Sequence, residues 1–186
     1  MKAVLVTTII LLISTLTAAI DLPSQQGQAT LPSQTTARPS DVKSLDAIML
    51  AVYDVISGPA GERDWGRLRS VFTPDARFIP TTRKPDGTFT YEVWTVDGLI
   101  EKAKERFKEH AFYEREVSRK VESFGCVTQV FSTYESRETP DGKPIERGIN
   151  SIQLFNDGSR WWVLSIYWDR ERPDNLIPAR YLNKKR

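Results

Sequence analysis

The segment DGSRWWVLSIYWD, at Asp157–Asp169, decides the fold class of this chain. It opens on Asp and Gly, which favour tight turns, and continues as a strand of aromatic and β-branched residues over Arg160–Asp169. Three similar segments precede it, separated by short turn signals, at Phe112–Phe124, Cys126–Arg137 and Glu146–Phe155. Because short connections join antiparallel neighbours, the C-terminal half is predicted to form a four-stranded antiparallel meander.

The residues before this meander carry helical periodicity. Apolar residues at three- and four-residue spacing predict three helices, over Asp41–Ser57, about Asp64–Val71, and Thr95 or Asp97 to about Glu109. Two short strands, Ala76–Thr82 and Thr88–Trp94, are expected between the second and third helices. Helices followed by a run of antiparallel strands make an α+β fold. We therefore expect a curved, mostly antiparallel sheet with three N-terminal helical segments packed on its concave face.

Residues 1–19 have the composition of a secretory signal peptide. Lys2 precedes an apolar run over Val4–Leu16, and the small residues Thr17 and Ala19 suit cleavage after Ala19. An uncleaved membrane anchor is the alternative. We expect the protein to be exported, to the periplasm or out of the cell, with no stable membrane span once the segment is cleaved.

The rest of the chain divides by composition into three parts. Residues 20–40 are rich in Gln, Ser, Thr and Pro and lack apolar periodicity, so a flexible linker is expected there. The folded domain is predicted over 41–182, and residues 183–186 form a short basic tail.

The composition also excludes several classes of function. Among 186 residues, 26 Lys and Arg stand against 24 Asp and Glu, a balance that does not suit nucleic-acid binding. A single histidine and a single cysteine rule out a disulfide scaffold and any metal site that needs several His or Cys ligands. Neither a metal nor a cofactor is therefore expected, and Cys126 is predicted to be a small buried side chain.

Two segments resemble the nuclear-transport-factor-2-like superfamily, whose SnoaL-like members form an α+β cone. They are DWGRLRSVFTPDARFIP, at Asp64–Pro80, and the terminal strand DGSRWWVLSIYWD. The order of elements agrees over about 41–170. The resemblance implies a hollow between helices and sheet and a homodimer formed through the sheet. It does not fix the activity, because the cone hosts isomerases, dehydratases, cyclases, epoxide hydrolases, transport adaptors and binding domains.

The catalytic sets of the enzymes in this superfamily do not carry over to this chain. Tyr53 could stand where ketosteroid-isomerase-like members place a tyrosine, but the first strand, ARFIPTT, offers no carboxylate base. The dehydratase-like members rely on paired interior histidines, and this chain has only His110. The Asp-Arg-Asp relay of the epoxide-hydrolase-like members has no matching set of positions.

The last strand is expected to form a pocket wall. Because side chains alternate across a strand, Trp162, Leu164, Ile166 and Trp168 form one apolar face, and the odd-numbered residues form a mixed one. We expect the mixed face to point into the cone. The candidate ligand-binding residues are Tyr53, Trp65, Tyr134, Asn150, Trp161 and Tyr167.

His110 and Asp169 are the candidate acid–base groups. Each also has a simpler interpretation, a packed helix-end histidine and a salt-bridged strand-end aspartate. The charged run Glu114–Lys120 alternates in sign and is expected to be a solvated, cross-strand-paired face, with an Arg115 or Arg119 clamp for a carboxylate ligand as the alternative.

Three functions remain open. The first is an exported domain that binds a small apolar or amphipathic molecule in its cone, without a catalytic set. The second is a small-molecule isomerase or dehydratase-like lyase that uses His110 with Asp169 or a tyrosine. The third is a dimeric adaptor that binds other proteins through an exposed sheet face.

Overall fold

The computed structural model describes residues 36–182. The predicted signal peptide at 1–19, most of the linker expected at 20–40 and the basic tail at 183–186 lie outside the described residues. The helices are α1 (Pro39–Val42), α2 (Leu45–Asp54), α3 (Trp65–Val71) and α4 (Val96–Glu109), and a short 3-10 helix covers Ala179–Tyr181. None of the helices described has both the length and the apolar composition needed to cross a bilayer.

The helix expected over Asp41–Ser57 is divided in two. Ser44 has an extended backbone (φ −151°), and its hydroxyl accepts a hydrogen bond from the amide of Ala47 at 3.1 Å. This is an N-cap, so α2 starts after Ser44 and not at Ser40 or Asp41. The other two helices are confirmed, since Asp64 caps α3 and Thr95 caps α4 through side-chain acceptors.

Six strands form one sheet and confirm the expected meander. They are β1 (Phe72–Arg83), β2 (Phe89–Tyr91), β3 (Tyr113–Phe124), β4 (Val127–Arg137), β5 (Glu146–Asn156) and β6 (Trp161–Arg170). Their order across the sheet is β2-β1-β6-β5-β4-β3. All neighbours are antiparallel except β1 and β6, which are parallel: the last strand of the meander, β6, lies beside the earlier strand β1. The fold is therefore α+β with a curved, mostly antiparallel sheet, as predicted.

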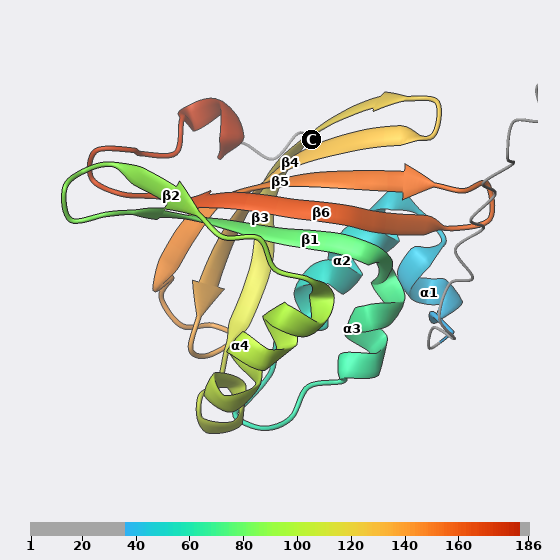
Figure 1. The fold of residues 1–186 in the computed structure, drawn as a ribbon, viewed down its shortest axis with the longest axis horizontal. Coiled ribbons are helices and arrows are strands. Elements are labelled where there is room, and N and C mark those ends of the chain that lie inside the picture. The colour runs from blue at the N-terminus through green and yellow to red at the C-terminus, as the bar shows by residue number, and fades with distance from the viewer. Residues whose placement is uncertain (1–35, 183–186) are drawn as a thin grey trace, which may run out of the picture. The chain divides into compact units, whose positions relative to one another are not determined.

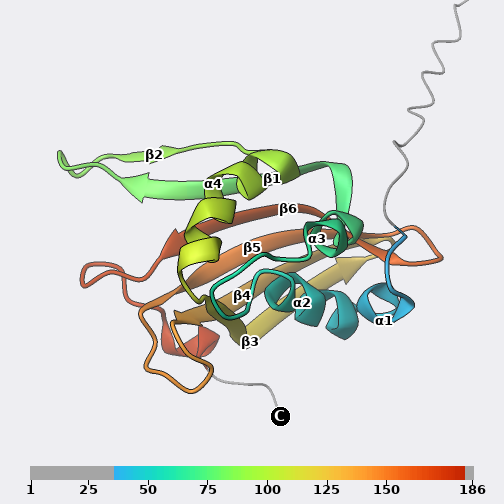
Figure 2. The same cartoon turned by 90° about the horizontal axis from the view of Figure 1, so that it is seen from below.

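The helices α2, α3 and α4 all lie on one face of this sheet, called here the inner face (Figures 1 and 2). The buried core lies between them and includes Ile48, Leu68, Phe72, Ile152 and Val163. On the opposite, outer face, the chain after β6 folds back, and the hydroxyl of Thr133 donates to the carbonyl of Tyr181 at 2.6 Å.

A β-bulge divides β6 into two halves with opposite side-chain orientation. Gln153 of β5 pairs with Ser165, but the next residue, Leu154, pairs with Val163, so Leu164 is an extra residue in β6. The prediction that side chains alternate strictly between the two faces from Trp161 to Asp169 is therefore wrong. Val163 points inward before the bulge and Ile166 after it, so neither the odd nor the even set forms one continuous face.

An ion-pair network joins the three N-terminal helices. Arg67 of α3 bonds Asp41 of α1 at 2.7 Å and also pairs with Asp54 of α2. The hydrogen bond from Arg67 is the main reason why the pKa of Asp41 is lowered, against the opposing effect of its burial. The network starts at α1, whose first residue is Pro39, two residues before the expected domain boundary at 41.

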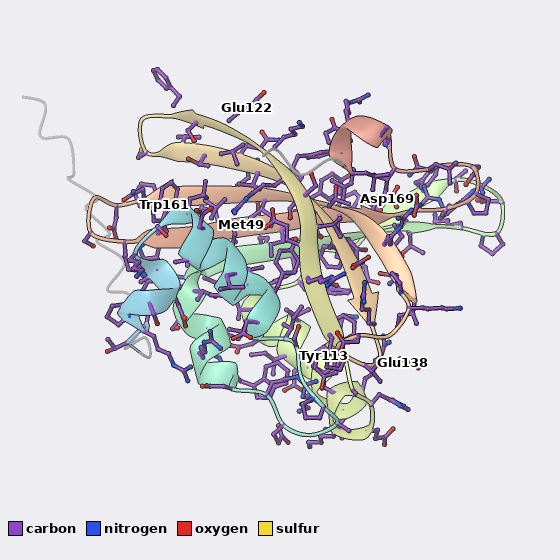
Figure 3. The ribbon with its side chains drawn as sticks, turned by 180° about the vertical axis from the view of Figure 1, so that it is seen from behind. Met49, Tyr113, Glu122, Glu138, Trp161 and Asp169 are labelled. Carbon is purple, nitrogen blue, oxygen red and sulfur yellow. The ribbon has the colours of Figure 1, made fainter. Side chains whose placement is uncertain are left out.

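The prediction that Cys126 is buried is wrong. Cys126 is exposed in the turn between β3 and β4, next to Gly125 with a φ of +57°. Glu122 marks this end of the hairpin in Figure 3, away from the helices. Phe124 at the same tip is 89% exposed, so the tip lacks the packing that would bury a small thiol.

Candidate functional site

A cavity of about 280 Å³ lies between the helices and the inner face of the sheet. Small-molecule sites range over roughly 300–1,000 Å³, so this cavity suits a small ligand. Its walls are largely apolar, from Val52, Ile56, Leu68, Phe72, Phe78, Ile166 and three tryptophans, Trp65, Trp94 and Trp168. The polar residues that line it include Glu114, Tyr134, Glu146, Asn150, Lys102, Arg106 and Arg170.

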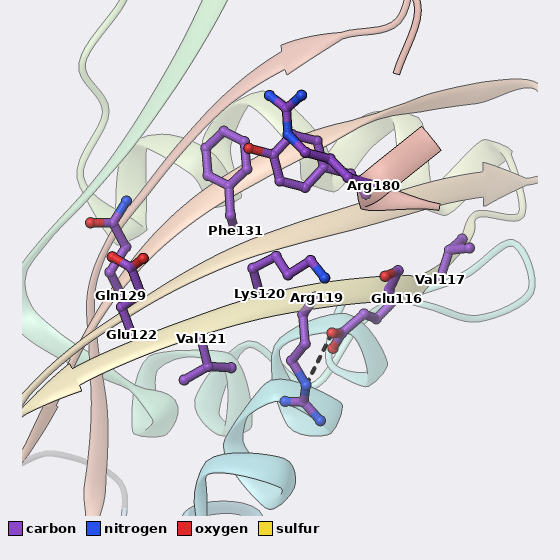
Figure 4. A pocket seen from close by; sticks show the side chains of 11 residues that line it. Glu116, Val117, Arg119, Lys120, Val121, Glu122, Gln129, Phe131 and Arg180 are labelled. Atoms are coloured by element: carbon purple, nitrogen blue, oxygen red, sulfur yellow. Dashed lines mark ion pairs between the residues drawn. The ribbon is translucent and has the colours of Figure 1, made fainter. Parts of the chain in front are cut away.

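A wider groove of about 950 Å³ lies on the outer face, between β3, β4 and the 3-10 helix (Figure 4). Figure 4 shows Arg119 turned toward the helices, where it pairs with Glu116, while Lys120 points the other way. Glu122 and Gln129, which also line the groove, are exposed strand side chains. We take the smaller inner cavity as the candidate site because, of the two, it borders a half-buried carboxyl that has no partner among the described residues.

That group is Glu114, near the start of β3. Ser57 fixes the backbone there, since its hydroxyl accepts from the Glu114 amide at 2.9 Å and donates to the carbonyl of Tyr53 in α2 at 2.7 Å. The side chain of Glu114 lines the cavity, and within residues 36–182 its carboxyl has no hydrogen-bond or ion-pair partner. Burial, and secondly the charge of Glu146, raise the pKa of Glu114 to about 8. The carboxyl is therefore mostly protonated at pH 7.

A second polar group on the cavity wall is fully hydrogen-bonded. The phenol of Tyr134 donates to Oε1 of Glu146 at 3.0 Å, and Nε of Arg170 lies 3.1 Å from Oε2 of the same carboxylate. Burial, together with the nearby carboxylates Glu146 and Glu114, raises the pKa of Tyr134, so its hydroxyl stays protonated. The charges of Glu146 and Arg170 cancel, so these three side chains add no net charge to the cavity wall.

A third group is built around Tyr53 of α2. Its phenol lies 2.7 Å from Oγ of Ser132 and accepts from Nδ2 of Asn150 at 3.2 Å. Burial raises the pKa of Tyr53, so this hydroxyl too stays neutral. Asn150 lines the cavity, and Tyr53 stands behind it as its hydrogen-bond partner.

The structure brings together half of the predicted ligand-binding residues. Trp65, Tyr134 and Asn150 line the cavity, and Tyr53 contacts it through Asn150. Tyr167 is 49% exposed and borders a groove on the outer face under the C-terminal segment, because the bulge at Leu164 turns it outward. Trp161 packs against the core but lies at the far end of β6 from Asp169 (Figure 3).

Neither His110 nor Asp169 lines the cavity, so the acid–base pair expected from the sequence is not assembled there. The side chain of His110 is 68% exposed and lies 3.9 Å from Glu109. Helix α4 ends at Glu109 and His110 has an extended backbone, so the helical stripe cannot be continued to this residue. Asp169 is held by Arg172 and Thr81. The hydrogen bond from Arg172 is the main cause of its lowered pKa.

Sequence reasoning missed Glu114 and Glu146. Glu114 was assigned to a solvated face, although alternation along β3 separates it from Arg115, which is exposed and pairs with Glu135. The useful signal was that Glu114 and Glu116 share a face, but the sequence does not say which face the helices cover. Within residues 36–182, no three His, Cys, Asp or Glu side chains are placed to hold a metal ion.

No protein-family model and no curated protein matches this sequence. Solved structures do share its fold. A protein of unknown function with a cystatin-like fold from Nostoc punctiforme is 11% identical, with a TM-score of 0.50, over 69% of this chain and 91% of that one. An uncharacterised protein with a cystatin-like fold from Caulobacter vibrioides is 14% identical, with a TM-score of 0.50, over 71% and 90%.

An NTF2-like protein of unknown function from Silicibacter pomeroyi is 13% identical, with a TM-score of 0.45, over 69% of this chain and 94% of that one. At such identities a likeness establishes a fold and no activity. The first two structures show that the part of the chain that the structure describes has a cystatin-like α+β fold.

Proposed function

We propose that this protein binds a small, largely apolar molecule with one polar group in the cavity between its helices and sheet. The observation that carries this is Glu114, a half-buried carboxyl at the cavity wall with no partner among the described residues. A fully buried polar group without a hydrogen bond costs about 1–3 kcal/mol and a half-buried one costs part of that, so a ligand that supplies the bond recovers free energy.

The state of Glu114 defines the polar group of the ligand. With its pKa raised to about 8, the carboxyl is mostly protonated at pH 7 and can donate its proton to a carbonyl, ether or hydroxyl oxygen. The walls around it are aromatic and aliphatic, so the rest of the ligand is apolar. Trp65, Trp94 and Trp168 on these walls give binding a fluorescence signal.

A titration with 1-octanol, followed by tryptophan fluorescence at pH 7, tests the proposal. Wild type is expected to give a saturable change. Glu114→Leu, which removes the hydrogen bond, should weaken binding by about tenfold, and Glu114→Gln should retain most of it. The matched control is Glu122→Leu on the exposed outer side of the same strand, which should behave as wild type. No saturable signal from the folded wild-type protein would overturn the proposal.

Acid–base catalysis is the second candidate, and the raised pKa of Glu114 favours it. A carboxyl that titrates at about 8 can accept and return a proton near neutral pH, as an isomerase or lyase requires. The phenol of Tyr134 in the same wall keeps its proton in the hydrogen bond to Glu146, which leaves Glu114 as the group that would exchange a proton. Among the described residues, this role suits Glu114 better than His110 or Asp169, which lie outside the cavity.

Exchange of the α-hydrogens of 2-octanone in D₂O, measured by NMR, tests this second candidate. Abstraction of an α-proton by the Glu114 carboxylate and return of a deuteron would label the ketone. The rate should rise with pH up to about 8 and level off, because the base is the ionised form. Glu114→Gln should abolish the exchange. Equal exchange in the two proteins would reject catalysis by Glu114 while leaving ligand binding intact.

We also propose that the protein acts after export. The ground for this is the composition of residues 1–19, which resembles that of a secretory signal peptide. N-terminal sequencing of the protein recovered from the periplasm or the medium tests this, with cleavage after Ala19 as the expected result.

A homodimer through the outer face is a further proposal. Leu164 and Tyr167 are exposed there, with 41% and 49% of their surface open. Light scattering at micromolar concentration should give twice the monomer mass, and Leu164→Glu should return the monomer. A wild-type monomer at that concentration would reject the dimer.

A further inference from the structure

The cavity-facing side of α4 is not purely apolar. Leu99, Lys102, Ala103, Arg106 and Phe107 all line the cavity, at the three- and four-residue spacing of one helical stripe. The side chain of Lys102 is half exposed, so it lies at the edge of the cavity. Two cations therefore lie one turn apart on the side of α4 that borders the candidate site.

Placing two like charges four residues apart is unfavourable by a few tenths of a kcal/mol, roughly 0.2–0.5. Lys102 is compensated, since its Nζ lies 4.8 Å from the centre of the Trp94 ring and 3.2 Å from Glu92. Arg106 lies over the ring of Phe112 at 5.9 Å, and within residues 36–182 it has no acidic partner.

The third cation on the cavity wall is Arg170, on β6. It is paired with Glu146 at 3.1 Å. Two of the three cations thus have a carboxylate each. Arg106 is exposed to solvent at the edge of the apolar cavity, and within residues 36–182 no carboxylate pairs with it. The raised pKa of Glu114 adds no negative charge to cancel it at pH 7.

We propose that the ligand of this cavity is a small amphipathic monoanion, whose apolar body lies among the tryptophans and whose anionic head, such as a carboxylate, pairs with Arg106. This rests on the proposed function, which requires only that an apolar molecule with a polar group enters the cavity. It adds the charge of the ligand and the residue that recognises it.

The probes are octanoate and 1-octanol, which share an eight-carbon chain and differ in the charge of the head. Their affinities are measured by tryptophan fluorescence at pH 7. Wild type should bind octanoate more tightly than octanol. Arg106→Gln should weaken octanoate by about tenfold and change octanol by less than twofold. Arg106→Lys, which keeps the charge, should recover part of the octanoate affinity.

Lys108→Gln is the matched control. It removes one positive charge from the same helix, but Lys108 pairs with Glu62 and Glu105 and does not line the cavity. It should leave both affinities unchanged, so that an effect of total charge is separated from contact with the ligand.

The outcomes separate the two proposals. Equal effects of Arg106→Gln on octanoate and octanol, or tighter wild-type binding of octanol, would overturn the monoanion and leave the cavity as a ligand site. Failure of both probes to bind folded wild-type protein would overturn both.

Discussion

Tyr134 lies directly across the sheet from Gly148, and its phenol occupies the space that a side chain at residue 148 would need. A Cβ added at Gly148 would overlap the backbone carbonyl oxygen of Asp169 and would stand 2.6 Å from the phenolic oxygen. The glycine therefore allows the hydroxyl of Tyr134 to reach Glu146 in the cavity wall.

Gly148→Ala is expected to lower the free energy of unfolding by about 2–3 kcal/mol, as overpacking of a filled interior does. The methyl would push the phenol away from Glu146. Urea unfolding measures the loss, and the octanol titration should show weaker binding in the same variant.

Gly98→Ala provides the control. The nearest atoms to a Cβ there are at 3.4 and 3.5 Å, in the first turn of α4, and alanine favours the helix by up to about 1 kcal/mol. That variant should be neutral or stabilised. Equal stability of wild type and Gly148→Ala would mean that both the phenol of Tyr134 and the backbone of β6 at Asp169 can move aside.

The half-buried Glu114 makes the free energy of unfolding depend on pH. Its pKa is raised from 4.5 in the unfolded chain to about 8 in the folded protein, so the folded state holds the proton more tightly. The stability of wild type should therefore fall between about pH 4.5 and pH 8, then stay level. Glu114→Gln removes this loss, so its advantage over wild type should grow from near zero at pH 4.5 to on the order of 3 kcal/mol at pH 9.

Glu122→Gln, the same change on the exposed outer side of β3, should show no such pH-dependent difference. Urea unfolding at several pH values measures both variants against wild type. A constant difference between Glu114→Gln and wild type from pH 4.5 to pH 9 would contradict a raised pKa at this site.

The network of Arg67 and Asp41 should dominate the acid sensitivity of the N-terminal helices. The pKa of Asp41 is lowered below 3.8, chiefly by its hydrogen bond from Arg67. A lowered carboxyl pKa contributes stability that is present above pH 3.8 and is lost as the pH falls through the folded value. Asp41→Asn should cost about 2–3 kcal/mol at pH 7, and less toward pH 2.

The comparison variant is Asp97→Asn, because Asp97 pairs with Arg69 at the surface. Surface pairs contribute about 0–1 kcal/mol, so this variant should differ little from wild type at either pH. If the two variants lost the same free energy of unfolding at pH 7, the Asp41 network would contribute no more stability than a surface ion pair.

Octanoate binding should weaken as the pH rises through about 8. Above that value Glu114 is ionised, and its negative charge repels an anion in the same cavity. Octanol carries no charge, so its affinity should change much less. In Glu114→Gln the pH dependence of octanoate binding should disappear, and its persistence there would assign the effect to another group.

Much of the fold could be predicted from local patterns. The four C-terminal strands each begin and end within about one residue of their expected bounds, because Gly125, Gly142 and Gly158 mark their turns. The caps Asp64 and Thr95 likewise mark the starts of α3 and α4. These signals depend on neighbouring residues only, so the sequence contains them in full.

The site could be predicted only in part, because its geometry depends on contacts between distant segments. The break at Ser44 and the extra residue Leu164 are local irregularities that a periodic pattern does not contain. A strictly alternating strand would place Tyr167 in the pocket and Trp168 outside it. In the structure Trp168 lines the cavity and Tyr167 lies on the outer face. Glu114 was missed because its face of β3 is decided by where the helices pack.

The extra residue in β6 also makes the pocket tolerant of one particular change in evolution. If the single codon for Leu164 were lost, Val163 and Ser165 would become consecutive and would still pair with Leu154 and Gln153. Trp168 and Arg170 would then keep their places on the wall of the hollow. One in-frame deletion could thus make the strand regular without exchanging the side chains that line the pocket, whereas a deletion at an ordinary strand position turns every later residue to the other face.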